Sequence, residues 1–363
     1  MSESDWSDVP VLGEIVSAAR RNLNLNSWDY LTGGAESETT LLRNRQAIDS
    51  IAFRPRVLCD VEHVDASSEV LGARQRIPVL LAPVGSLQHF DVRGSVASSK
   101  AAHDFGISAF ISSVTNPSME EVRAQTETHL IFQLYVRGDE DWIFERLDAA
   151  RDLGYSAICL TVDTANYGRR ERDLTKRFLP SARLGVVGDR TFQAALSWDT
   201  IRRIRDRYSL PLMVKGIATA EDAEKSLSMG LDYVYVSNHG GRQLDHGRGS
   251  MEVLPEVVAA LGGKCPVIID GGFCRGSDVI KAIAMGAAAV GIGKLYGLGL
   301  AAGGEGGVRR VLELLEVEML NVMALLGATA LDQLGPEHVA AANPVRAPSL
   351  TSAFPLYDDP DYP

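Results

Sequence analysis

Eight short apolar runs recur along the middle of the chain, and helix-length segments that mix polar and apolar residues separate them. The runs lack the strict alternation of a half-exposed strand, and continuous apolar runs are typical of parallel strands buried on both faces. The segments between them, such as residues 118–125 and 139–154, begin with Ser or Asp, as helices commonly do. The runs cover residues 79–83, 107–112, 130–135, 157–163, 212–215, 233–237, 267–270 and 289–293. Eight strand–helix repeats predict an α/β fold, a (β/α)8 TIM barrel.

The ends of the chain do not follow this repeat. Residues 1–75 are expected to form an N-terminal helical cap segment, with helices near residues 15–22 and 38–48. Residues 76–343 form the predicted barrel. Residues 344–363, rich in Pro and Asp, form a C-terminal tail that is either mobile or docked on a neighbour.

Two stretches interrupt the regular spacing. The fourth and fifth runs start at residues 157 and 212, so the connection between them carries an insertion, roughly residues 174–197. Long connections of this kind are often lids or linkers. Residues 303–307, GGEGG, resemble a phosphate loop but follow a helix-like stretch, so we expect a loop before the last barrel helix at residues 308–326.

Composition narrows the class of protein. The chain has 363 residues, 45% of them hydrophobic and 23% charged, which is typical of a globular protein. Its formal net charge of −11, with no basic stripe, disfavours nucleic acid as a partner. The N-terminal residues are acidic without an apolar core, and the longest apolar run, residues 77–87, is short for a membrane span. No CxxC pair is present among the four cysteines, so we expect a cytoplasmic protein with no membrane partner.

Polar residues follow most of the apolar runs, where a barrel places its active site. Polar residues accumulate wherever strands give way to loops, which could explain some of these positions. That alternative explains poorly a Gln and a Tyr within IFQLY or a Lys that closes LMVK, because unpaired Lys is almost never fully buried. The residues are Ser112, Gln133, Tyr135, Thr161, Asp163, Lys215, Ser237, Asn238, His239, Asp270, Gly271, Gly272, Gly293 and Lys294.

The segment YVYVSNHGGRQLDHG, residues 233–247, carries the most specific chemistry. His239 can exchange a proton near neutral pH, and Arg242 can grip a carboxylate with its planar fork. A purely structural role for His239 is one alternative. A metal site through His239, Asp245 and His246 is another, although these residues share no helical i, i+4 face and have no cysteine nearby.

VSNHGGRQLD resembles the active-site signature of the FMN-dependent 2-hydroxy-acid oxidase and dehydrogenase family, which includes glycolate oxidase, lactate oxidase and mandelate dehydrogenase. The resemblance extends over residues 28–326. It also includes DYLTGGAESETTLLRNR, FRPRVL, FQLYV, LTVDT, GRRERD, LPLMVKGI and IDGGFCRGSDVIKAIAMGAAAVGIG, all in the family's order.

The resemblance implies that FMN lies across the mouth of the barrel. Lys215 would stabilise negative charge at the pyrimidine end of the reduced flavin. The side chains expected to hydrogen-bond the isoalloxazine ring are Ser112, Gln133, Thr161 and Ser237. The main chain at Pro83, Val84 and Gly85 is expected to face N5 of the flavin.

For the FMN phosphate, the resemblance points to Asp270, Gly271, Gly272 and Gly293, after the last two strands. Two arginines usual in this region are replaced by Cys274 and Lys294. Lys294 still supplies a positive charge and Arg275 is retained, so we expect FMN either to bind more loosely or to rely on Arg275, with the tail or another chain as further sources of contacts.

The substrate residues of the family are all matched. Arg170, Arg242 and Tyr30 are expected to clamp the carboxylate of a small anionic 2-hydroxy acid. His239 would act as the base, and Asp163 would stabilise the imidazolium that forms. Tyr135 would hydrogen-bond the substrate hydroxyl. Whether electrons leave as a hydride or through a carbanion stays open.

Val114 stands where the family often has an aromatic residue, so we expect a substrate bulkier than glycolate, mandelate-like or long-chain. The segment HFDVRGS, residues 89–95, also departs from the family. The insertion is shorter than that of glycolate oxidase, which agrees with a more open site.

Three other functions compete with this interpretation. One is FMN-dependent oxidation of an amine or amino-ketone carbon in a modified or peptide-derived compound; another is a non-catalytic binding barrel; the third is a flavin-dependent isomerase. We favour oxygen over a quinone as electron acceptor. The family resemblance further implies a homo-oligomer, a tetramer.

Overall fold

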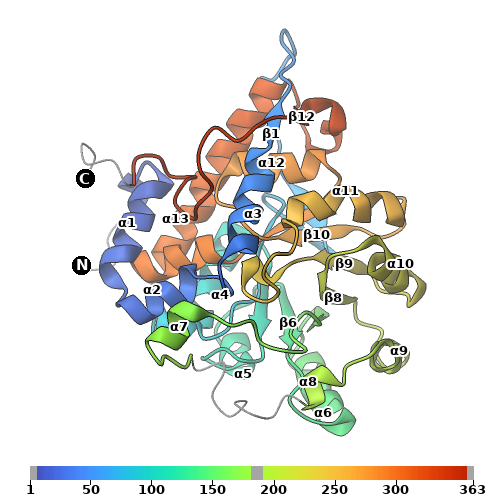
Figure 1. The fold of residues 1–363 in the computed structure, drawn as a ribbon. Helices are drawn as coiled ribbons and strands as arrows, with labels where there is room; N and C mark the ends of the chain where they lie inside the picture. The colour runs from blue at the N-terminus through green and yellow to red at the C-terminus, as the bar shows by residue number, and fades with distance from the viewer. Residues whose placement is uncertain (1–5, 181–190, 358–363) are drawn as a thin grey trace.

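The eight apolar runs form a closed parallel barrel, as predicted (Figure 1). The protein is described by a computed structural model that covers residues 6–180 and 191–357. Strand β4 pairs with both β5 and β11, and this pairing closes the sheet. The barrel strands are β4 (Val79–Leu81), β5 (Ala109–Ser112), β6 (Leu130–Leu134), β7 (Ala157–Thr161), β8 (Leu212–Ile217), β9 (Tyr233–Val236), β10 (Val267–Asp270) and β11 (Ala289–Ile292).

Helices follow the strands and cover the outside of the barrel. The predicted helix starts are confirmed where a side chain caps the first turn: the Ser118 hydroxyl accepts from the Glu121 amide, and the Asp139 carboxylate accepts from the Trp142 amide. The barrel helices are α4 (Gly94–Phe105), α5 (Met119–Arg123), α6 (Glu140–Asp152), α9 (Trp198–Arg207), α10 (Ala220–Ser228), α11 (Ser250–Leu261), α12 (Gly276–Ala284) and α13 (Lys294–Leu326). The fourth connection also contains α7 (Glu171–Thr175) and α8 (Thr191–Ala194); residues 181–190 of the predicted insertion lie outside the described residues.

The N-terminal segment is helical up to residue 49, whereas its later part, residues 51–75, forms short strands. It contains α1 (Leu12–Asn22), α2 (Leu25–Thr32) and α3 (Thr39–Asp49). Helix α1 packs on α13, whereas α3 lies against α11 and the short turn His239–Gly241, at the mouth of the barrel. Short 3-10 turns complete the ends, at Trp6–Asp8, Leu87–His89, Leu331–Gln333 and Pro336–His338.

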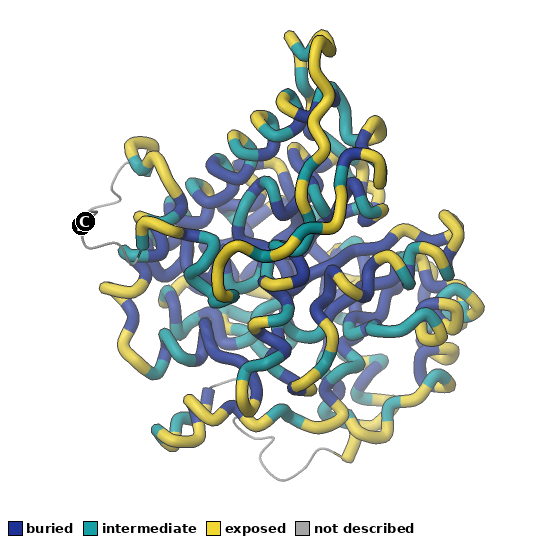
Figure 2. Tube along the Cα trace, turned by 45° about the horizontal axis from the view of Figure 1, so that its top comes forward, coloured by how far each residue is buried: buried dark blue, intermediate teal, exposed yellow. Residues whose placement is uncertain are grey.

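The opposite end of the barrel is closed by a hairpin of β2 (Ser68–Val70) and β3 (Ala73–Gln75). Val70 and Leu71 join the side chains inside the barrel in one buried apolar cluster. The Leu71 amide donates to the Tyr233 hydroxyl at 2.8 Å. Burial is concentrated in the barrel and on the inner faces of its helices (Figure 2). The barrel is therefore open to ligands at its carboxyl end.

The glycine-rich stretch at residues 303–307 interrupts α13, which consists of two helices joined across a kink. Gly303 and Gly304 leave helical backbone angles, with φ of −159° and +57°, so a break precedes the last helix, as expected. The difference from the expectation is that another helix, which begins at Lys294, precedes this break. Trp6 packs so close to Gly303 that a Cβ there would clash with its ring.

The described part of the C-terminal tail packs on its own chain. Strand β12 (Val339–Ala341), just before the tail, pairs antiparallel with β1 (Ile51–Phe53). The tail then crosses the structure, and the Phe354 side chain is only 2% exposed. Within the described residues, no helix is both long and apolar enough to cross a membrane.

Candidate active site

A cavity lies at the carboxyl ends of the barrel strands, under helices α2 and α3. The loops after β4, β5, β6 and β9 reach it, and so do residues at the ends of β8, β10 and β11. The predicted site residues that line it are Tyr30, Pro83, Val84, Gly85, Val114, Tyr135, Arg170, Lys215, His239, Arg242, Asp270, Gly271, Gly272, Gly293 and Lys294. Residues spread over most of the sequence thus meet in one place.

His239 stands between an acid and a phenol. Its Nδ1 atom lies 3.0 Å from Oδ1 of Asp163, and its Nε2 atom lies 3.3 Å from the Tyr135 hydroxyl. A carboxylate at Nδ1 accepts the ring N–H there, so the neutral ring keeps its lone pair on Nε2. The Nε2 atom can therefore take a proton from a molecule bound beside Tyr135.

Burial and charge keep this pair in the required ionisation states. Burial lowers the pKa of His239, with Lys215 and Arg170 adding to the effect, and Asp163 opposes it only in part. Burial would raise the pKa of Asp163, but His239 and Lys215 outweigh it and hold that pKa below its usual range. A neutral imidazole thus faces an ionised carboxylate near neutral pH, as a general base requires.

The backbone around His239 is strained. His239 has a φ of +59°, and Gly240 and Gly241 follow with φ of +63° and +75°. A Cβ on Gly241 would lie 2.5 Å from the backbone of Leu41 in α3, so only glycine fits there. A non-glycine residue held in this region is costly, and such strain is common in active sites.

Two guanidinium groups also line the cavity. Arg242 donates to the carbonyls of Tyr30 and Gly33 at 2.5 and 3.1 Å, and its guanidinium lies 4.9 Å from the centre of the Tyr30 ring. Arg170 is buried nearby, with its Nε 3.5 Å from the Arg242 carbonyl. Burial and the Arg170 charge lower the pKa of Arg242 to about 10. Two such cations side by side favour an anionic ligand between them.

The inside of the barrel mouth holds a third cation, Lys215. Its Nζ lies 2.8 Å from the Ser237 hydroxyl and 3.2 Å from Asp270, and Ser237 donates to Asp270 at 2.5 Å. Burial would lower the pKa of Lys215, but Asp270 and Asp163 more than compensate and raise it. Lys215 thus remains an ammonium ion at the base of the cavity.

Two side chains at the strand ends carry buried polar atoms that have no hydrogen-bond partner within residues 6–180 and 191–357. They are Gln133, at both amide atoms, and Thr161, at its hydroxyl. Such atoms are costly to bury unless a ligand satisfies them. Ser112, by contrast, already accepts from the Val114 amide at 3.4 Å. A planar heterocycle with ring nitrogens and carbonyls, such as a flavin, would fit the Gln133 and Thr161 atoms.

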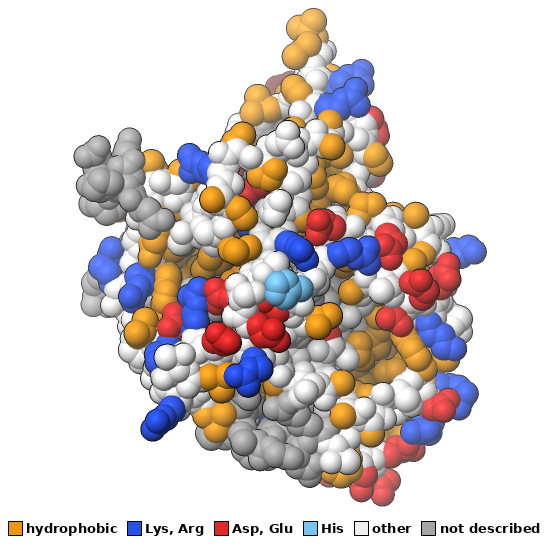
Figure 3. Space-filling model, in the orientation of Figure 1, with side chains coloured by type: hydrophobic (Ala, Val, Ile, Leu, Met, Phe, Trp, Pro, Cys, Tyr) orange, Lys and Arg blue, Asp and Glu red, His pale blue; other side chains and the backbone are white. Residues whose placement is uncertain are grey.

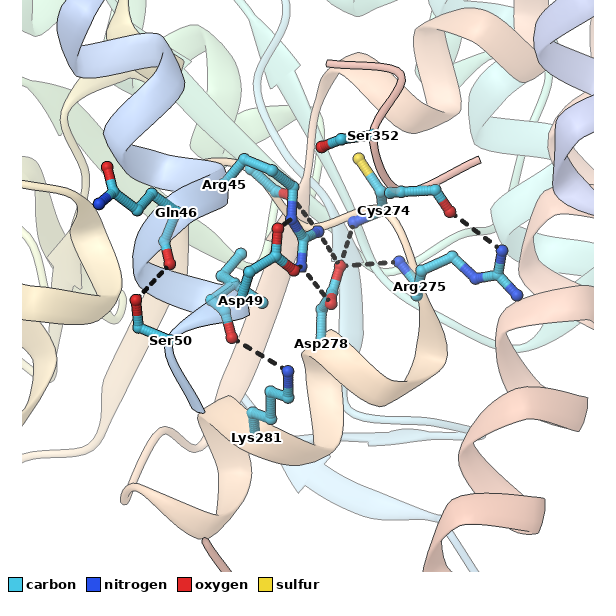
Figure 4. Close-up of polar contacts among 12 residues, drawn as sticks. Arg45, Gln46, Asp49, Ser50, Cys274, Arg275, Asp278, Lys281 and Ser352 are labelled. Atoms are coloured by element: carbon cyan, nitrogen blue, oxygen red, sulfur yellow. Dashed lines mark hydrogen bonds and ion pairs between the residues drawn. The ribbon is translucent and has the colours of Figure 1, made fainter. Parts of the chain in front are cut away.

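The turn after β10 is shaped for a close approach of a ligand to the backbone. Gly271 and Gly272 have φ of +109° and +89°, and Asn44 of α3 leaves little space for a side chain at either glycine. Arg45, next to Asn44, lines the cavity and binds Asp278 through two contacts of 2.6 and 2.9 Å (Figure 4). This buried pair fixes α3 over the start of α12.

Arg275 does not occupy the predicted place. Its guanidinium lies 2.6 Å from Glu318 and donates to the Ala353 carbonyl at 3.2 Å, and it is not part of the cavity wall. The structure therefore does not bring Arg275 to the cavity, and its contact with the cofactor phosphate stays a prediction. Lys294 does line the cavity, where it donates to the Gly240 carbonyl at 2.9 Å.

The metal alternative has no support in the geometry. Asp245 accepts from the amides of Ser37 and Thr40 and thereby holds the start of α3. His246 is mostly exposed beside it, whereas His239 faces the cavity. In the described part of the chain, no cluster of His, Cys, Asp or Glu could hold a metal ion.

Several residues that position the site were not predicted, and Asn238 was singled out without a role. The side-chain amides of Asn44 and Asn238 pair in both directions, at 2.9 and 2.7 Å, and tie α3 to the His239 loop. Gln243 donates to the Asp163 and Asn166 carbonyls. Phe90 lines the cavity and stacks on Tyr30. Asn238 and Gln243 lie within the signature segment, which was the available signal.

Acidic and basic side chains are interspersed over the visible surface, with no basic stripe on that face (Figure 3). The cavity differs from this mixture, because Arg170, Arg242, Lys215 and Lys294 all line it.

Comparison with known proteins agrees with this geometry. Residues 19–341 match the family model of FMN-dependent dehydrogenases. The chain is 38% identical over 348 residues to a peroxisomal (S)-2-hydroxyacid oxidase of Arabidopsis thaliana, covering 91% of this chain and 96% of that one. It is 36% identical over 355 residues to glycolate oxidase of Spinacia oleracea, covering 92% and 96%.

Solved structures give the same picture. A soluble mutant of the membrane-associated (S)-mandelate dehydrogenase from Pseudomonas putida superposes with a TM-score of 0.87 at 36% identity, covering 92% of this chain and all of the other. A mandelate oxidase with (S)-2-phenylpropionate superposes with a TM-score of 0.85 at 34% identity, covering 93% and 99%.

Proposed function

Because the chain belongs to the FMN-dependent dehydrogenase family, we propose that it is an oxidase of 2-hydroxy acids bulkier than glycolate. Independently of this proposal, the protein is an FMN-dependent oxidoreductase that oxidises the CH–OH group of a 2-hydroxy acid. The observation that carries the proposed reaction is that His239, paired with Asp163, lines the same cavity as the Arg170–Arg242 clamp.

The clamp binds and orients the substrate. Arg242 and Arg170 face the carboxylate of the acid, and their buried charges strengthen the attraction because water is excluded. Tyr30 lies beside them, with its hydroxyl 3.1 Å from the Gly85 carbonyl. A cationic amine would be repelled by the same two guanidiniums, which disfavours the amine-oxidation alternative.

His239 moves the proton. With the carboxylate in the clamp, the hydroxyl-bearing carbon comes close to Nε2 and the Tyr135 hydroxyl. Burial and the Asp163 charge hold the pKa of Tyr135 well above its usual value, so Tyr135 stays a hydrogen-bond donor. His239 takes one proton, and Asp163 stabilises the imidazolium that results.

FMN, when bound, accepts the two electrons that leave the substrate carbon. Gln133, Thr161 and Lys215 are the residues that would hold its ring system. An ammonium at Lys215 favours negative charge on the ring.

The cavity wall beside the substrate favours a substrate with a bulky side chain. Val114, Val84 and Phe90 line it, so the wall is apolar. Each buried methylene contributes about 0.8 kcal/mol, so three additional carbons would give roughly a fiftyfold preference.

Anaerobic stopped-flow reduction with glycolate, lactate, 2-hydroxyoctanoate and mandelate tests the proposal. We expect the larger acids to have the higher kcat/KM, and Val114→Trp to reverse the order. Val92→Trp, at a position 83% exposed, is the control and should change neither value. Glycolate as the best substrate of both proteins would refute the pocket argument, and reduction by amines alone would refute the reaction.

The electron acceptor is part of the proposal and has its own test. We propose oxygen, so substrate turnover in air should form peroxide. Reoxidation by a quinone or dye with negligible peroxide formation would make the protein a dehydrogenase instead. The cytoplasmic location and the tetrameric assembly stay predictions; the mass of the purified protein in solution tests the second.

A further inference from the structure

The C-terminal tail reaches the cavity described above. Ser349 and Leu350 form part of the cavity wall, together with Gly272, Cys274, Gly293 and Lys294. These four residues follow the last two barrel strands. The tail therefore meets the end of the cavity where a barrel binds phosphate.

Two contacts hold the tail in this place, and hydrogen bonds within the tail close its turn. The Phe354 side chain is 2% exposed and belongs to the main apolar core. Arg275, itself paired with Glu318, donates to the Ala353 carbonyl at 3.2 Å. Ser349 and Ser352 bond to each other, with each backbone amide donating to the other's hydroxyl, at 3.1 and 2.9 Å.

The barrel offers few free cations at this end. Arg45 is bound to Asp278 and Asp49, and Arg275 to Glu318. Cys274 is buried, and burial raises the pKa of its thiol to about 12, so it is neutral. The amides of Cys274 and Arg275 both donate to Asp278. Among these residues, Lys294 could therefore bind a dianionic phosphate, but the phosphate needs further hydrogen-bond donors.

We infer that the turn at Ser349–Ser352 is part of the FMN site. Its Ser349 hydroxyl, which lines the cavity, donates to the phosphate in place of a charged side chain at Cys274, while the Ser352 hydroxyl donates to the Ser349 carbonyl and keeps the turn closed. Figure 4 shows Ser352 beside Cys274, on the side of its sulfur atom. A small residue at position 274 leaves room for the tail, whereas an arginine there would extend into the same space. This inference rests on the FMN cofactor of the proposed function.

The test compares FMN with riboflavin, which has the same ring system but no phosphate. Both are titrated into the full chain after removal of flavin, and binding is followed by quenching of flavin fluorescence. The variants are Ser349→Ala/Ser352→Ala, Phe354→Ala and a chain that ends at residue 343. Val345→Ala and Leu356→Ala, at exposed positions of the same tail, are the matched controls.

We expect the double serine variant to raise the Kd for FMN by about tenfold or more, the range for hydrogen bonds to a charged group. Truncation should raise it further. The Kd for riboflavin should change by less than about twofold, because the tail acts on the phosphate alone.

Two outcomes overturn the inference. An unchanged Kd for FMN in the double serine variant means that the tail makes no contact with the phosphate. Equal losses for FMN and riboflavin mean that the tail supports the fold or the ring site instead. If the truncated chain does not fold, the serine variant decides alone. If the full-length chain binds neither FMN nor riboflavin, the assignment of FMN as the cofactor is overturned as well. This result distinguishes failure of the proposed function from failure of the tail contact alone.

Discussion

The Nδ1 atom of His239 lies 3.0 Å from Oδ1 of Asp163, and this contact determines which nitrogen of the imidazole can act. Since Nδ1 keeps its proton for the carboxylate, Nε2 is the basic atom, and it points toward the Tyr135 hydroxyl. Loss of His239 removes the base itself, whereas loss of Asp163 changes the pKa of that base. Substitutions of the two residues are therefore distinguishable.

His239→Gln should remove the base and keep the cofactor. We expect the rate constant for anaerobic flavin reduction to fall by about 10²- to 10⁴-fold, the usual contribution of general acid–base catalysis. The Kd for FMN should stay the same. His246→Gln, on the exposed histidine nearby, is the control. A reduction rate within twofold of the unsubstituted protein would show that His239 is not the base.

Asp163→Asn should change both the rate and its pH dependence. His239 must be neutral to act, and its pKa lies below the ordinary 6.5, so kcat/KM should fall only in the acid range below that value. Asp163 is the group that raises this pKa, so its removal should move the acid limb to still lower pH. The plateau should fall, because the imidazolium loses its partner. An acid limb that moves to higher pH would contradict the assigned role.

The barrel could be predicted from sequence because its strands are buried on both faces and read as continuous apolar runs. The same pattern locates the strand ends, where Thr161 pairs in register with Lys215. That register brings Lys215 and Asp163 to the same edge, so the general rule for barrel enzymes was sufficient to group them.

Contacts between segments far apart in sequence could not be predicted in this way. Asn44 and Asn238 are 194 residues apart, and their pairing depends on how α3 packs over the barrel mouth. The direction of the Arg275 side chain depends on Glu318, which is 43 residues away on α13. Neither the Asn44–Asn238 contact nor the Arg275–Glu318 contact can be predicted from the local pattern of apolar and polar residues.

The tail shows the limit of composition as a guide. Prolines suggested a mobile or externally docked tail, yet Phe354 is buried in the main apolar core of this chain. Composition was a better guide at GGEGG, because Gly303 and Gly304 do interrupt the helical backbone. Tertiary contacts outweigh local preference in the tail.

The buried pair of Arg45 and Asp278 should be important for stability. Both side chains are at most 5% exposed, and removing one partner leaves a buried charge with less compensation. We expect Asp278→Asn to lower the free energy of unfolding by about 3–5 kcal/mol, measured with urea at a fixed FMN concentration. Asp199→Asn, which breaks the exposed pair with Arg202, should lower it by at most about 1 kcal/mol. Equal effects of the two substitutions would contradict this prediction.

Arg242→Lys should weaken substrate binding more than it slows flavin reduction at saturating substrate. The guanidinium donates to the Tyr30 and Gly33 carbonyls while it faces the cavity, and an ammonium cannot reproduce that fork. We expect the Kd for a 2-hydroxy acid, from the concentration dependence of reduction, to rise by about 10- to 100-fold at pH 7. Arg248→Lys, in the same loop but paired with Glu256 at the surface, is the control.

The pH dependence of the Arg242→Lys variant provides a stricter test of the same clamp. Burial and the Arg170 charge lower the pKa of Arg242 from 12.5 to about 10, so binding to the unsubstituted protein should be constant up to about pH 9. A lysine starts from a lower pKa, and the same surroundings would carry it into the measured range, so the variant should lose further affinity between pH 7 and 9. If the variant's Kd did not change over that interval, the charge at position 242 would not be what holds the substrate carboxylate.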